Sequence, residues 1–129
     1  MAITRWADSS FYEMGATDFE TLMEGANGKM LVCSGADNPG DRAAALSAAL
    51  AAVDSPAITL AGADGADKTI TFAANSTVAI DTSGTATNIC LIDDTRLLFV
   101  TPCTSQALVD TGTVDIPEWA ITLKQPSAP

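Results

Sequence analysis

The sequence predicts one mainly β domain: a small antiparallel β-sandwich or flattened barrel of roughly six to eight strands, with one short helix and an extended N-terminal arm. Three observations predict this fold class. The chain has 129 residues, of which 47% are hydrophobic and 17% charged, and this suits a single buried core. From residue 57 onward, apolar residues alternate with polar ones in short segments rich in Thr, Ile and Val. Gly, Asp and Ser separate these segments, as they do in turns.

The predicted organisation has three parts: an N-terminal arm at 1–24, a single β-rich domain at 25–125, and a flexible tail at 126–129. The arm is apolar and shows no strand-like alternation. Thr17 and Glu20 have the spacing of a capping box, which predicts a short helix from Asp18 to Glu24 that Gly25 ends. After the following turn, Lys29–Ser34 is predicted as the first strand.

A helix is predicted from Asp41 to about Val53. A stretch dense in turn formers precedes it, and Asp is a common N-cap residue. Leu46, Leu50 and Val53 form a narrow apolar stripe, while the many alanines raise helix propensity and allow close packing on a sheet or a neighbouring subunit. Pro56 then prevents further extension.

Period-two alternation predicts the remaining strands. Met30 and Val32, or Ile70 and Phe72, would face the core, and the threonines between such residues would face solvent. One face of the sheet is therefore predicted to be buried and the other wet. The later predicted strands are Ile58–Ala61, Lys68–Ala73, Thr77–Asp81, Thr85–Ile92, Arg96–Thr101 and Trp119–Lys124.

Asp93 and Asp94 predict a tight hairpin between two strong strands. Pro117 precedes the last predicted strand and indicates a position at the edge of a sheet. The register after the hairpin stays open, because the residues facing the core could be either Leu98 and Val100 or Leu97 and Phe99.

The charge of the chain argues against nucleic acid as a partner. Its formal net charge is −10, with no histidine. A protein that binds nucleic acid clusters its basic residues against phosphates, whereas here they are scattered singly: Arg5, Lys29, Arg42, Lys68, Arg96 and Lys124. Without histidine there is no Ser-His or Cys-His dyad and no usual zinc ligand. We therefore predict a protein that is not an enzyme and that has no cofactor and no metal.

The apolar segments and the cysteines predict where the protein is made. The longest alanine-rich run, Ala43–Val53, is far shorter than the roughly 20 residues that cross a bilayer. The N-terminus has no apolar signal-peptide core, so neither secretion nor membrane insertion is expected. Cys33, Cys90 and Cys103 are odd in number and lack C-x-x-C spacing, which favours buried thiols in a reducing compartment.

Paired carboxylates allow an alternative, a small hydrolase or lyase. The candidates are Asp64 with Asp67 and Asp93 with Asp94. Turns select Asp for backbone reasons, so a structural role is favoured at both places. The loop at 37–41 superficially resembles a calcium loop but lacks its ligand register and distal Glu, and it is predicted to be a turn followed by a helix cap.

The aromatic arm is the candidate partner-binding site. Its apolar side chains either fold back over the domain's own core or become buried on a neighbouring subunit or larger partner. Because aromatic residues and Met are enriched at the centres of interfaces, we interpret the following residues as partner-binding: Trp6, Phe11, Tyr12, Met14 and Phe19.

Residues 85–123 carry several motifs: a T-A-T opening, a strand ending in L-I-D-D, then R-L-L-F-V-T, T-S-Q-A-L and V-D-I-P-E-W-A-I. With weaker similarity upstream, through ITFAANSTVAI, this segment resembles a small family of tailed-bacteriophage virion proteins. The resemblance implies a β-rich capsid decoration (cement) protein, made in the host cytoplasm, that binds the major capsid protein. An acidic protein is repelled by packaged DNA, so the expected place is the outer surface of the shell, beside neighbouring copies of itself as a homo-oligomer.

The alternative within the same family is a head-fibre or tail-associated module that binds the host surface. Exposed loops, such as those at 61–68 and 101–112, would then contact a receptor or glycan. The number of copies on each particle separates the two functions.

Overall fold

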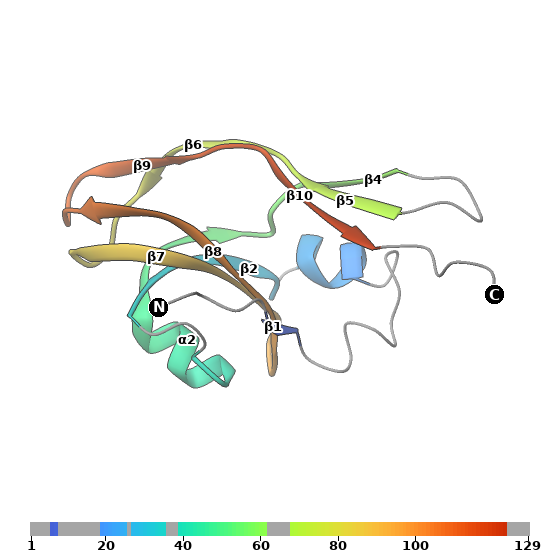
Figure 1. Cartoon of the computed structure of the whole chain (residues 1–129), viewed down its shortest axis with the longest axis horizontal. Coiled ribbons are helices and arrows are strands. Elements are labelled where there is room, and N and C mark those ends of the chain that lie inside the picture. The colour runs from blue at the N-terminus through green and yellow to red at the C-terminus, as the bar shows by residue number, and fades with distance from the viewer. Residues whose placement is uncertain (1–5, 8–18, 26, 36–38, 62–67, 124–129) are drawn as a thin grey trace.

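The protein is a two-layered β structure with a helix on its outside (Figure 1). The computed structural model describes residues 6–7, 19–25, 27–35, 39–61 and 68–123. The first layer is an antiparallel five-stranded sheet, whose order is β1 (Trp6–Ala7), β8 (Leu97–Leu108), β7 (Gly84–Ile92), β2 (Lys29–Ser34) and β3 (Ala49–Asp54). The prediction of a mainly β, antiparallel fold is confirmed.

The second layer is built from two long bent paths that pair with each other. In Figure 1, β6 continues the line of β5, and β10 continues the line of β9. A three-stranded sheet and a two-stranded sheet result: β10 (Trp119–Leu123), β5 (Lys68–Phe72) and β4 (Ile58–Ala61), and then β6 (Asn75–Ala79) with β9 (Thr113–Ile116). A bridge between Ala51 and Ile80 joins the two layers along one side, which gives the sandwich the character of a flattened barrel.

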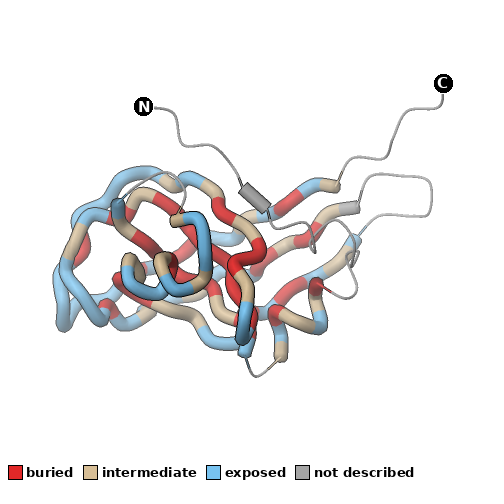
Figure 2. Tube along the Cα trace, turned by 90° about the horizontal axis from the view of Figure 1, so that it is seen from below, coloured by how far each residue is buried: buried red, intermediate tan, exposed pale blue. Residues whose placement is uncertain are grey.

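The main core lies between the two layers and a smaller one lies under the helix α2 (Arg42–Ala48). Met30 and Val32 of β2 share the face toward the main core, as predicted, but Leu31 and Cys33 are buried in the second core. The prediction of one wet face is therefore wrong for the central strands, because α2 covers that face. Figure 2 shows buried residues gathered in the interior of the molecule and exposed ones along its outer turns.

The helix predicted from Asp41 to Val53 ends at Ala48, and Ala49–Asp54 is strand β3. The predicted cap is confirmed, since the Asp41 carboxylate accepts a hydrogen bond from the N–H of Ala44 at 2.8 Å. Helix propensities of ordinary residues differ by less than about 1 kcal/mol per residue. The antiparallel pairing of β3 with β2 therefore outweighs the helix propensity of the alanines in this segment. The predicted stripe is thus divided: Leu50 is buried in β3, while Leu46 on α2 is 39% exposed.

A β-bulge resolves the register that the sequence leaves open. Leu91 pairs with Phe99 and Ile92 with Leu97, so Leu98 has no residue opposite it. An extra residue in one strand changes which face the following side chains reach. Leu98 and Phe99 accordingly pack on the main core, and Leu97 and Val100 pack in the core under α2. Neither of the two predicted pairs faces one core alone.

Most other strand predictions are close to the structure. β2 and β4 have the predicted bounds, and β5, β7 and β10 agree within one residue over the described part of the chain. β6 begins two residues earlier than predicted, and β8 continues to Leu108. The last strand, after Pro117, lies at a sheet edge as predicted. β1, β3 and β9 were not predicted as strands.

Two pieces of the predicted arm pack on the domain. Trp6 and Ala7 pair with Val100 and Phe99, which makes β1 an edge strand of the five-stranded sheet. Residues 19–24 form the helix predicted for Asp18–Glu24, within the described residues. Its Phe19 and Met23 are fully buried in the main core.

Candidate functional site

The structure places the predicted partner-binding residues in different surroundings. Phe11, Tyr12 and Met14 lie outside the described residues, and of Trp6 only the backbone is described, in β1. At Phe19 the structure differs from the prediction. Its side chain is 1% exposed and lies in the domain's own core, because the helix at 19–24 covers the end of the sandwich with its apolar face.

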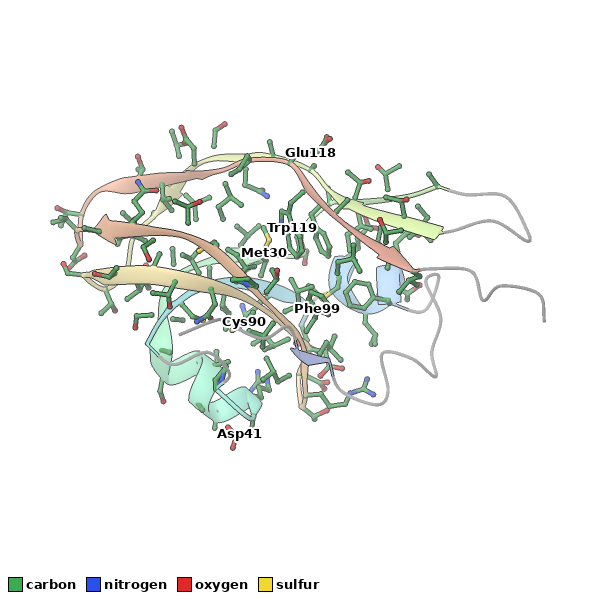
Figure 3. The ribbon with its side chains drawn as sticks, viewed as in Figure 1. Met30, Asp41, Cys90, Phe99, Glu118 and Trp119 are labelled. Atoms are coloured by element: carbon green, nitrogen blue, oxygen red, sulfur yellow. The ribbon has the colours of Figure 1, made fainter. Side chains whose placement is uncertain are left out.

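An aromatic cluster connects that helix to both layers. The ring of Phe19 meets Phe72 edge to face, with centroids 6.2 Å apart. Phe72 stacks on Trp119, with centroids 4.3 Å apart and ring planes inclined by 9°. The indole Nε1–H of Trp119 reaches across to the sulfur of Met30 at 3.3 Å, and Figure 3 shows these two side chains approaching each other from opposite layers. The cluster holds the sandwich together, and its central ring is not available to a partner.

The Asp93–Arg96 turn is confirmed as a hairpin and is held by a buried carboxylate. One oxygen of Asp93 accepts hydrogen bonds from the N–H groups of Thr95 and Arg96, at 2.9 and 2.7 Å. The other oxygen accepts from Nε and Nη2 of Arg96, at 3.0 and 2.7 Å. From α2, Arg42 donates its Nε–H to the carbonyl oxygen of Asp93 at 2.7 Å. This carboxylate is used to build the turn.

Opposing effects set the pKa of Asp93. Burial by itself raises it, because a carboxylate loses its hydration. The hydrogen bonds from Thr95 and Arg96, together with the charge of Arg96, outweigh burial and hold the pKa of this carboxyl below its ordinary value. Asp93 is therefore ionised at neutral pH and is a structural anion, not a proton donor.

The three cysteines carry free thiols in unreactive surroundings. A hydrogen bond with Cys90, and then burial, raise the pKa of the Cys33 thiol. Burial, and then Cys90, raise the pKa of Cys103, which is half-buried. Cys90 itself is fully buried and donates its S–H to the side-chain oxygen of Asn88 at 3.2 Å. The prediction of buried thiols is confirmed for Cys33 and Cys90, while Cys103 is partly accessible.

We expect an alkylating reagent to modify Cys103 alone in the native chain, and more slowly than a free thiol in a peptide. Only the thiolate reacts, and a raised pKa keeps its population small at neutral pH. Mass spectrometry of peptides after a time course measures the modification. The chain in denaturant, where all three thiols should react, is the control. Native-state modification of Cys33 or Cys90 at the rate of Cys103 would contradict the burial described here.

The remaining candidates for catalysis or metal binding, Asp64 and Asp67, lie outside the described residues. Within the described ranges, no three His, Cys, Asp or Glu side chains are close enough to hold a metal ion. No described helix is both long and apolar enough to cross a membrane.

The fold gathers the described basic side chains at one end of the β7–β8 hairpin, although they are scattered singly along the sequence. Lys29 forms an ion pair with Asp54, and the β2 backbone places it beside Ile92, next to Asp93. With Arg42 and Arg96 it makes three basic side chains near the hairpin turn, each already bound to an acidic residue or its backbone. Many carboxylates stay exposed: Glu24, Asp41, Asp81, Asp94, Asp110, Asp115 and Glu118.

No family model matches the chain, and neither the curated proteins nor the solved structures contain a match to it.

Proposed function

We propose that this chain is a bacteriophage capsid decoration protein, which binds the outer surface of the major capsid protein lattice and stabilises the head. The observation that carries the proposal is the segment at 85–123, whose motifs resemble those of virion proteins. In the fold this segment supplies β7, β8, β9 and β10, and so contributes strands to both layers. The resemblance thus covers the framework of the sandwich and not one isolated loop.

The surface charge supports an external position. The described basic side chains are engaged near the hairpin turn, while exposed carboxylates are spread over the described surface, Asp94 in that turn included. Such a surface is repelled by packaged DNA and is attracted to basic patches on a protein. A decoration protein acts through contacts alone, because binding to the assembled shell but not to its dissociated subunits stabilises the shell. At a hundredfold excess over Kd the gain is about 2.7 kcal/mol per site.

Heads that lack this protein should become more resistant to heat when the purified chain is added. We expect the temperature of DNA release to rise with occupancy and to reach a plateau at saturation, because each bound copy adds its binding free energy. Release is measured with a dye that fluoresces on DNA, and an unrelated acidic protein of similar size is the control. Full occupancy with an unchanged release temperature would contradict the cement function.

One observation favours the alternative, a head-fibre or tail-associated module that binds the host surface. Four consecutive residues of β8, Thr104 to Ala107, are all exposed, so this part of the strand presents side chains to solvent on both faces. Polar, two-sided exposure suits contact with a receptor or glycan. Hundreds of copies on each head would support decoration, whereas a few copies at one vertex would support the alternative.

A further inference from the structure

The end of the sandwich opposite the Asp93–Arg96 turn carries a protruding apolar side chain. Val109 is 66% exposed and begins the turn at 109–112, between β8 and β9. The N–H of Gly112 donates to the carbonyl of Val109 at 3.0 Å, and the N–H of Asp110 donates to Oγ of Ser83 at 2.8 Å. The N–H of Ile80 donates to the carbonyl of Gly112 at 3.1 Å. The turn is thus fixed from two sides, and Val109 is presented on an ordered backbone.

The same turn contains backbone strain. Thr111 has φ = 76°, in the left-handed region that β-branched residues rarely adopt. A residue held there is strained and persists only where its surroundings impose this conformation. Strain of this kind is concentrated at binding sites, where a fixed shape lowers the entropy lost on association. Leu46, the other exposed large apolar residue among those described, lies instead on a helix of ordinary geometry.

Carboxylates surround Val109. Asp110 follows it in the turn, and Asp81 lies in the adjacent loop, where its N–H donates to the carbonyl of Leu50 at 2.8 Å. Both side chains are exposed, and neither the turn at 109–112 nor the loop at 81–83 contains a basic residue. The described basic side chains lie near the other end of β7, about 25 Å away for a strand of this length. This end therefore carries exposed carboxylates with no described basic side chain beside them, whereas at the hairpin end acidic and basic side chains lie together.

We propose that the acidic end, consisting of the turn at 109–112 and the loop at 81–83, is a docking site for a protein surface that has a small apolar pocket edged by Lys or Arg. Val109 enters the pocket, and Asp81 and Asp110 face the basic edge. The inference rests on the proposed function, in which that surface belongs to the capsid lattice and the chain stands on the shell by this end. Charge complementarity identifies the occupant, because the described basic side chains of a second copy are already bound to acidic residues or their backbone and supply no basic edge for the site.

The test uses heads assembled without this chain as the binding probe. Val109→Ser should weaken binding about tenfold, because it removes a buried apolar side chain from the contact. The double variant Asp81→Asn/Asp110→Asn should weaken binding about fivefold at low ionic strength and should reduce the salt dependence of Kd. Matched controls are Leu46→Ser, which removes the other exposed apolar residue, and Asp94→Asn, which removes a charge at the opposite end. Both controls should bind as the unchanged chain does.

The outcomes distinguish the site from the function. Melting temperatures verify that each variant is folded, and Val109→Thr, which keeps the β-branched shape, provides a second replacement with a smaller loss in the same direction. If the unchanged chain binds heads and the variants at Val109, Asp81 and Asp110 bind equally well, the docking site is wrong while the proposed function stands. If the unchanged chain does not bind heads, both are wrong. If the controls at Leu46 and Asp94 lose as much binding affinity for heads as the variants at Val109, Asp81 and Asp110, the proposed docking site is also wrong.

Discussion

Replacing Phe19 with alanine is expected to lower the free energy of unfolding of the isolated chain by about 3–5 kcal/mol, the usual cost of removing a fully buried phenylalanine. Its ring is 1% exposed and packs edge to face on Phe72, which is itself completely buried. The loss combines the transfer of the ring to water with the cavity that remains behind. Urea unfolding followed by tryptophan fluorescence measures it, since Trp119 stacks on Phe72 and reports on the same cluster.

Leu22→Ala is the matched control, because Leu22 lies on the same helix but is only half-buried. It should cost clearly less, and alanine compensates in part through its higher helix propensity. The double variant Phe19→Ala/Phe72→Ala should show a coupling free energy of about 0.5–1.5 kcal/mol, which is typical of an aromatic pair.

The Phe19 variant also decides between two functions of the N-terminal segment. If Phe19 is a core residue, its replacement destabilises the free chain whether or not a partner is present. Unchanged stability combined with weaker binding to heads would instead show that Phe19 is a partner anchor, as the sequence-based interpretation held. The structure favours the first result, because the buried faces of Phe19 and Met23 complete the main core.

The strands that could be predicted are those in which alternation and turn residues agree. Lys29–Ser34 and Ile58–Ala61 have both signals, and their predicted bounds match the structure. β3 has neither, because its sequence, ALAAVD, is dominated by alanine, which favours a helix when considered alone. Only the open edge of β2, a feature of the tertiary structure, makes it a strand. Local propensity could not reveal this.

The candidate sites were harder to predict than the fold. Lys29, Arg42 and Arg96 are far apart in the sequence, and strand pairing and the position of α2 bring them to one turn. Asp93 and Arg96 are three residues apart, so their ion pair could have been found from the hairpin signal. Val109 had no such signal, because a single valine in a turn becomes notable only through its exposure and the strain of its neighbour Thr111.

Replacing Asp93 with alanine is expected to destabilise the chain by about 2–4 kcal/mol at pH 7. The substitution removes a buried acceptor that takes backbone hydrogen bonds from Thr95 and Arg96, and it leaves the guanidinium of Arg96 without this partner. Loss of hydrogen bonds to a charged group costs more than loss of neutral ones. The Arg96 side chain is 38% exposed and can be rehydrated, which keeps the effect below that of breaking a fully buried pair.

Asp93→Asn separates the two contributions of the carboxylate. An amide oxygen still accepts from the N–H groups of Thr95 and Arg96, but the charge that binds the guanidinium is lost. We therefore expect the stability of Asp93→Asn to lie between that of the unchanged chain and that of Asp93→Ala. Asp94→Ala is the control, because Asp94 is the exposed neighbour in the same turn and should change stability by less than about 0.5 kcal/mol.

The effect of Asp93→Ala should depend on pH in a defined direction. The pKa of Asp93 is lower in the folded chain than in the unfolded one, so ionised Asp93 stabilises the fold in full above the unfolded value, near pH 4. As the pH falls through the lower folded value, the native carboxylate becomes protonated and this stabilisation is lost. Urea unfolding from pH 7 to pH 2 measures the free energy of unfolding of the unchanged chain and of Asp93→Ala. The difference between these two free energies should be constant above about pH 5 and should shrink below about pH 4. A difference that grows on acidification would mean that burial, and not the Arg96 pair, dominates at this carboxylate.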